Sequence, residues 1–211
     1  MIVQSWDEVA PDGEIQSDLY IPMKLEFPLD EYKGGGRFYC NYLSSADGSH
    51  HPGEGRGLRT SLLEVVVEKS SGLLCRLVLV DVLRVRYQDY DPGQVVNGNP
   101  VFDIEATLGD RLFQRDRVST GGEMLPSVDQ YEQYELWVGG DRLTIMFEGR
   151  TTNMSIRTGM HLIVFVDEDQ EVCGFQFTGI TPAQRAGIID SLTFKGTYMG
   201  TVIEGQDTFA G

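Results

Sequence analysis

The segment LIVFVDEDQEVCGFQF places four acids between two apolar runs. Asp167, Asp169 and Glu171 have the i, i+2, i+4 spacing with which an EF-hand calcium loop begins. That loop also needs a glycine at its sixth position and a glutamate at its twelfth, where this chain has Val172 and Thr178. The pattern therefore favours the acidic tip of a β-hairpin over a calcium site.

Two adjacent histidines, His50 and His51, lie with Asp47 and Glu54 in a glycine-rich polar stretch. These residue types bind metals, but a catalytic metal needs about three ligands that are held in fixed positions. A glycine-rich loop does not fix the positions of its side chains, so we predict no metal and no other cofactor. The sequence also contains no GxSxG motif and no phosphate-binding GK[ST] loop, so we expect a protein that is not an enzyme.

The charge balance indicates what kind of partner the chain could have. It has 17 basic and 32 acidic residues, which gives a net charge of −15. Such a surface repels phosphate backbones, so we expect no nucleic-acid partner. It attracts basic proteins and accelerates their encounter, an effect that falls with salt. An acidic surface that only keeps the protein soluble is the alternative.

A second acidic stretch, SVDQYEQYELW, brings aromatic residues among acids. Aromatic side chains with charges around them are typical of protein-docking surfaces, although a strand with an inward aromatic face gives the same pattern. We take the acids and aromatics of both stretches as candidate partner contacts. They are Asp167, Glu168, Asp169, Tyr131, Glu132, Tyr134, Glu135 and Trp137.

The elements that would carry these residues are mostly strands. Twenty-five glycines favour tight turns and hairpins. Strand-like runs cover 19–27, 37–43, 61–68, 73–87, 101–108, 111–118, 134–138, 142–148, 160–166 and 171–180, with a last strand over 193–203. Thr181, Pro182 and Gln184 form a helix start with a capping box. We predict a mainly antiparallel β fold with one short carboxy-terminal helix near 182–192.

The chain could form one β-rich domain over 1–211, or two similar halves, 1–90 and 100–211, that the turn-rich segment 89–100 joins. Two hairpin-like stretches, VVVEKSSGLLCRLVLV and IVFVDEDQEVCGFQFT, share one layout. Two similar hairpins in one sheet, or one in each of two halves, would explain the likeness, but independent convergence on a common hairpin pattern is the favoured explanation.

The sequence also bears on location. The amino-terminal residues lack a basic start followed by an apolar core, and no apolar run reaches the roughly 20 residues that a bilayer needs. Cys40, Cys75 and Cys173 lie far apart and form no CxxC pair, which favours buried free thiols in a reducing compartment. We therefore expect a cytoplasmic protein that does not insert into a membrane.

Residues 141–179 resemble a small bacterial domain family of unknown function. LTIMF matches the short first strand of that family, and VFVDEDQEVCGFQF matches its hairpin. Gln170 stands where the family has a turn glycine, which predicts a slightly different turn geometry. The resemblance implies a β-hairpin unit and no catalytic residue.

The whole chain resembles, in composition and layout, the immunity proteins of bacterial polymorphic-toxin systems. It shares with them an acidic composition and a strand pair of the kind LLEVVVEKSSGLLCRLVLV. The resemblance implies a non-enzymatic cytoplasmic protein that binds a basic toxin domain and occludes its active cleft.

A third resemblance gives an alternative. CGFQFTGITPAQRAGIIDSL is similar to the last strand and helix of the PilZ β-barrel, which binds cyclic-di-GMP. Arg111 and Arg115 form the R-x-x-x-R of that family, and RVSTGG, with Ser119 and Gly122, is similar to its second motif. Arg117 replaces the usual Asp or Asn, which puts the nucleotide site in doubt. An uncharacterised structural or assembly protein is the remaining alternative.

Overall fold

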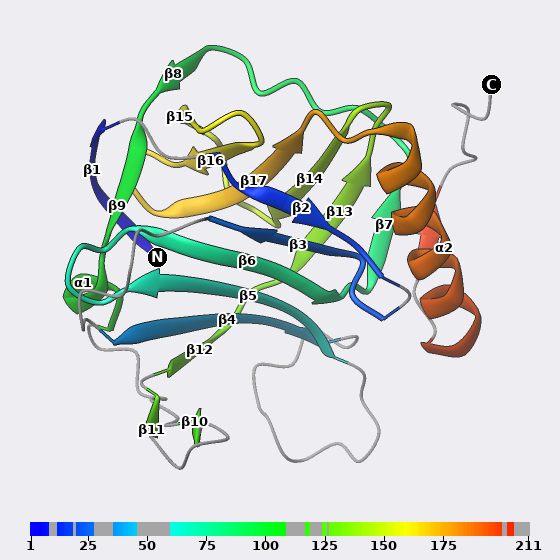
Figure 1. The fold of residues 1–211 in the computed structure, drawn as a ribbon, viewed down its shortest axis with the longest axis horizontal. Coiled ribbons are helices and arrows are strands. Elements are labelled where there is room, and N and C mark those ends of the chain that lie inside the picture. Colours follow the sequence, from blue (N-terminus) through cyan, green and yellow to red (C-terminus); the bar gives the residue numbers. More distant parts are fainter. Residues whose placement is uncertain are drawn as a thin grey trace.

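In a computed structural model of the chain, two large β-sheets pack face to face (Figure 1). The structure describes residues 1–8, 12–18, 20–27, 36–45, 60–108, 117–118, 124–125, 127–199 and 202–204. The predicted mainly β fold is confirmed, and so is a helix that begins at Pro182. Within the described residues, no helix combines the length and the apolar character needed to cross a membrane.

The first sheet has six strands, mostly from the amino-terminal part of the chain. In sheet order they are β12 (Ser127–Tyr131), β4 (Arg37–Ser45), β5 (Thr60–Glu68), β6 (Leu74–Asp81), β3 (Met23–Glu26) and β2 (Glu14–Gln16). All neighbours are antiparallel except β12 and β4, which run parallel.

The second sheet has eight strands. In sheet order they are β18 (Val202–Glu204), β7 (Arg84–Arg86), β13 (Tyr134–Val138), β14 (Arg142–Phe147), β17 (Val172–Thr178), β16 (Leu162–Val166), β15 (Met154–Thr158) and β8 (Val95–Asn97). The central strands are antiparallel, and β7 and β8 join their neighbours in parallel.

Smaller elements flank the two sheets. They are the strand pairs β1 (Ile2–Glu8) with β9 (Asn99–Asp103) and β10 (Arg117–Val118) with β11 (Met124–Leu125), and the helices α1 (Ile104–Leu108) and α2 (Pro182–Met199). Figure 1 shows β1 and β9 on one side of the two sheets and α2 on the opposite side. Val3 and Phe102 from the pair, and Ile188 and Leu192 from α2, belong to the same buried cluster as the sheets. These elements therefore close two open sides of the core.

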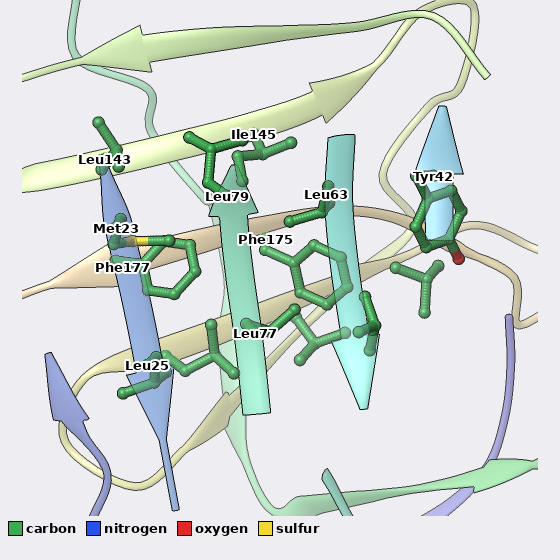
Figure 2. Close-up of a cluster of buried hydrophobic side chains, with 14 of the residues drawn as sticks. Met23, Leu25, Tyr42, Leu63, Leu77, Leu79, Leu143, Ile145, Phe175 and Phe177 are labelled. Carbon is green, nitrogen blue, oxygen red and sulfur yellow. The ribbon is translucent and has the colours of Figure 1, made fainter. Parts of the chain in front are cut away.

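The core lies between the two sheets because alternate residues of each strand point to the same face. Leu63, Leu77 and Leu79 of the first sheet meet Phe175 and Phe177 of the second, and all five are fully buried (Figure 2). Burying each of these side chains stabilises the fold by about 2–3 kcal/mol. The inward-facing side chains of the two sheets thus form the contact between them.

Helix α2 starts as the sequence predicts. The Gln184 backbone nitrogen donates to Thr181 Oγ1 at 3.3 Å, and the Thr181 backbone nitrogen donates to Gln184 Oε1 at 2.9 Å. The helix continues to Met199, beyond the predicted end at 192, so the strand predicted over 193–203 is wrong as far as Met199. Once a helix has formed, each further residue adds a hydrogen bond at little cost, which overrides the β-propensity of the segment.

Two further strand predictions need correction. The run 73–87 is not one strand, because β6 ends at Asp81 and β7 belongs to the other sheet. The run 101–108 is strand only to Asp103, whose Oδ1 accepts a hydrogen bond from Ala106 N at 2.8 Å and caps α1. Most of the run 111–118 lies outside the described residues.

The two similar hairpins of the sequence lie in different sheets, β5–β6 in the first and β16–β17 in the second. The chain also crosses between the sheets on both sides of the segment 89–100, since β7 lies in the second sheet and β12 in the first. Whether this arrangement is one domain or two stays a prediction.

Candidate functional site

The four-acid segment forms the tip of the β16–β17 hairpin, which we call the acidic apex (residues 167–171). Asp167 builds the turn: its Oδ1 accepts hydrogen bonds from the backbone nitrogens of Asp169 at 3.0 Å and Glu171 at 2.9 Å. The Asp167 nitrogen in turn donates to the Glu171 oxygen at 2.9 Å. Asp167 therefore serves the local structure of the turn.

Gln170 completes the turn in an uncommon conformation. Its φ is 63°, the left-handed region that favours glycine, and it is the only non-glycine residue of the described chain with a positive φ. A residue other than glycine adopts this conformation at a cost of about 1 kcal/mol. The slightly different turn geometry that the resemblance implies stays a prediction.

Strand β1 holds the apex from the side. The Val3 nitrogen donates to the Gln170 oxygen at 2.9 Å, and the Val172 nitrogen donates to the Met1 oxygen at 2.8 Å. Ile2 and Glu171 form an isolated antiparallel bridge between these bonds. The apex is thus fixed at its turn and along one edge.

Arg150 binds the acids at the base of the apex. Its guanidinium lies 2.7 Å from Glu132 Oε1, 3.1 Å from Asp167 Oδ2 and 2.5 Å from Glu171 Oε2. Burial alone would lower the pKa of Arg150, but the hydrogen bond to Glu171 and the charge of Glu132 raise the pKa above its usual value. The arginine therefore stays charged and occupies carboxylates that the sequence assigned to a partner.

Glu135, on the second sheet, is likewise bound by arginines of the chain. Its carboxylate lies 2.8 Å from Arg86 Nε and 3.5 Å from Arg84 Nη1, and it accepts a hydrogen bond from Trp137 Nε1 at 3.3 Å. The Trp137 ring packs edge-to-face on Tyr90, with the ring centroids 5.5 Å apart. Glu135 and Trp137 are therefore half-buried parts of a contact within the protein.

Tyr134 is a correction to the predicted surface. Its side chain is 2% exposed, and its hydroxyl donates to the Asp81 oxygen at 3.0 Å. Burial raises the pKa of Tyr134, so the ring stays neutral in the core. The even-numbered residues of β13 face the core, which is why Tyr134 cannot contact a partner in this structure.

The eight predicted contacts therefore fall into groups with different environments. Glu168 and Asp169 are exposed at the acidic apex, and Tyr131 is half-buried on β12. Asp167, Glu132 and Glu135 bind arginines of the chain. Of the predicted contacts, only Glu168 and Asp169, at the apex, are exposed. The sequence analysis did not identify Arg150; the sequence feature that pointed to it was the cluster of acids in the β16–β17 hairpin, which needs a nearby cation.

The residues of the alternative nucleotide site, Arg111, Arg115, Ser119 and Gly122, lie outside the described residues. The same holds for the loop with His50 and His51, Asp47 and Glu54. The strand and helix that resemble PilZ are present as β17 and α2. In the described part of the chain, however, both large sheets end in edge strands, whereas the resemblance implies a closed barrel.

The three cysteines are free and buried, as the sequence predicts. Burial raises the pKa of Cys75 to about 11 and also raises the pKa of Cys173, so both thiols are protonated and unreactive at neutral pH. Among the residues that the structure describes, no group of three His, Cys, Asp or Glu side chains is arranged to hold a metal ion.

Comparison with models of known protein families and with curated proteins finds no match for this chain.

Proposed function

We propose that the chain is a non-enzymatic protein of the immunity type, which binds the basic active cleft of a bacterial toxin in the cytoplasm. The observation that carries the proposal is the acidic apex. Glu168 and Asp169 are exposed on a turn that Asp167, Arg150 and β1 hold in place. A carboxylate pair on a rigid turn binds a cationic surface with little loss of conformational entropy.

The distribution of ion pairs supports this proposal. Cations of the described chain are engaged with its own acids: Arg76 with Glu64 at 2.9 Å, Arg84 with Glu148 at 2.9 Å, and Arg150 with three carboxylates. The chain as a whole has a net charge of −15, and Glu168 and Asp169 are exposed acids at the apex.

The mechanism is occlusion. A toxin that cleaves nucleic acid needs a basic cleft, and an acidic protrusion competes with the substrate for it. Opposite charges raise the rate of encounter, and this effect falls as salt screens the charges.

Co-expression with the product of the neighbouring upstream gene tests the proposal. We expect the chain to rescue growth and to form a complex whose association rate falls steeply with salt. Glu168→Lys and Asp169→Lys should each weaken the complex by about tenfold.

Glu105→Lys is the matched control, because Glu105 is exposed on α1 and the substitution changes the net charge by the same amount. It should change the affinity less than about twofold. Absence of both growth rescue and a complex would refute the immunity function, and an equal effect of all three substitutions would refute the role of the apex.

A further inference from the structure

The segment that contains β2 exposes every second side chain. Gly13 and Ile15 are buried and Ser17 is half-buried, whereas the residues between and around them are exposed. This is the period of an extended strand as far as Asp18, where the hydrogen-bonded turn that contains Tyr20 begins. We call the exposed side chains the β2 row; they are Asp12, Glu14, Gln16, Asp18 and Tyr20.

The ends of the β2 row carry the two large apolar side chains that are most exposed in the described chain. Tyr20 is 67% exposed and ends the row itself. Met160 is 62% exposed and lies beside the other end, since its nitrogen donates to Asp12 Oδ1 at 2.8 Å. Exposed apolar side chains at both ends of an acidic row suit a partner that binds along its length.

Tyr20 is held in position. Asp18 Oδ1 accepts hydrogen bonds from the nitrogens of Tyr20 at 2.7 Å and Ile21 at 2.8 Å. The Tyr20 ring packs edge-to-face on Phe194 of α2, with the ring centroids 5.8 Å apart. A tyrosine that is fixed before binding loses little entropy on contact, which is the property of the aromatic side chains that dominate protein interfaces.

Helix α2 lies beside the end of β2 (Figure 1). Gln184 Nε2 donates to the Ile15 oxygen at 3.0 Å. Gly187 lies so close to Ser17 that a Cβ atom there would be 3.0 Å from Ser17 Oγ. The edge strand β2 is therefore packed on the helix, and its exposed side chains stand on a fixed backbone.

The charge of the β2 row is not compensated by the neighbouring strand. Glu14 lies opposite Glu26 in β3, and Gln16 lies opposite Lys24. Lys24 binds Glu26 at 2.5 Å. Three carboxylates of the row thus face solvent beside a lysine that already has a partner.

We infer that the β2 row is a docking surface for an extended basic segment of a protein. Arginine or lysine side chains four residues apart in such a segment would bind Glu14 and Asp18, since side chains on one face of a strand recur at the same spacing. A cation would also stack on the Tyr20 ring. The inference rests on the proposed function in one respect, namely that the partner is basic.

The β2 row and the acidic apex are separate surfaces. The row lies beside α2, and the apex is bonded to β1, on the opposite side of the molecule (Figure 1). A basic partner that uses both surfaces must therefore reach around the sheets. This separation allows the two surfaces to be tested independently.

The test uses the full chain, labelled with ¹⁵N, and a nine-residue peptide of alternating arginine and serine. We expect amide shifts that concentrate at Gly13, Ile15 and Tyr20, and no shifts with a peptide of alternating glutamate and serine. Tyr20→Ala should weaken arginine-peptide binding by about tenfold, and Tyr20→Phe should retain it, because the ring makes the contact.

Two charge-neutralising variants complete the test. Glu14→Gln with Asp18→Asn should weaken the binding about tenfold, while the asparagine Oδ1 keeps the turn before Tyr20. Glu168→Gln with Asp169→Asn removes equal charge from the apex and should change the binding less than about twofold. Equal effects of the two pairs, or shifts spread over all acidic residues, would overturn the inference.

The outcomes also separate the two proposals. Peptide binding at the β2 row without any complex with the neighbouring gene product would refute the immunity function and support the docking surface. A complex that depends on Glu168 but is unchanged by Tyr20→Ala and by the Glu14 and Asp18 substitutions would support the function and remove the row as its docking surface.

Discussion

The Arg150 guanidinium lies 2.7 Å from the Glu132 carboxylate, and this ion pair joins parts of the chain that serve different sheets. Glu132 connects β12 of the first sheet to β13 of the second, and Arg150 follows β14. Because Arg150 also binds Asp167 and Glu171, the crossing between the sheets and the acidic apex share one cation.

Removal of that cation should be costly. Arg150→Ala removes one cation from three partly buried carboxylates, and we expect the free energy of unfolding to fall by about 2–3 kcal/mol in urea titrations. Arg142→Ala is the control, because its partner Asp141 is exposed, and the loss should stay below about 1 kcal/mol. Equal losses would mean that Arg150 contributes no more than a surface pair.

Substitutions at Gln170 test the strain in the turn. Gln170→Gly should raise the free energy of unfolding by up to about 1 kcal/mol, because glycine adopts a φ of 63° without steric cost. Gln170→Val should lower it by about 1–2 kcal/mol, since a branched Cβ is poorly tolerated there. Thermal unfolding gives the order of stability, and a valine variant as stable as the glycine variant would contradict the account.

Gly174 in β17 should not tolerate a side chain. A Cβ atom there would lie 2.4 Å from the Ile145 oxygen and 3.1 Å from the Phe165 ring, so Gly174→Ala should lower the free energy of unfolding by about 2 kcal/mol or more. Gly140 has no atom within 4 Å of the same position, and Gly140→Ala should change stability by less than about 0.5 kcal/mol. Chemical denaturation of both variants measures the difference.

Two buried glutamines should respond in opposite directions to leucine. Gln130 is 4% exposed, and neither its Nε2 nor its Oε1 has a hydrogen-bond partner among the described residues, so Gln130→Leu should raise the free energy of unfolding by about 1–2 kcal/mol. Gln176 Nε2 donates to the Tyr90 oxygen and to Thr144 Oγ1, so Gln176→Leu should lower it by a similar amount. A loss of stability in both variants would show that Gln130 has a polar role in the core.

The Cys75 thiol should make stability depend on alkaline pH. Burial raises its pKa to about 11, whereas an unfolded thiol titrates near 8.5, so above about pH 8.5 only the unfolded state loses the proton. The contribution is complete below that pH and is lost as the pH rises toward 11, on the order of 2–3 kcal/mol. Urea unfolding at pH 7.5, 9 and 10 should show a shallower decline for Cys75→Ala; parallel curves for the two proteins would exclude this contribution.

The sequence by itself determined the local elements. The strand-like runs became β5, β13, β14, β16 and β17, because each needs only its own apolar and β-branched residues and a neighbouring turn. Gly72 has the positive φ of 69° that the KSSG turn predicts, and the Thr181 capping box starts α2. These features depend on interactions between residues that are close in the sequence, so the local residue pattern is enough to predict them.

The tertiary structure alone decided which face and which partner each side chain has. Alternation separates the two faces of a strand without saying which one meets the core, so Tyr134 is buried although acids flank it. Ion pairs such as Arg84 with Glu148 join residues 64 positions apart, which no local pattern encodes. The same holds for the β2 row, because its exposure depends on α2 and β3 covering the other sides of β2.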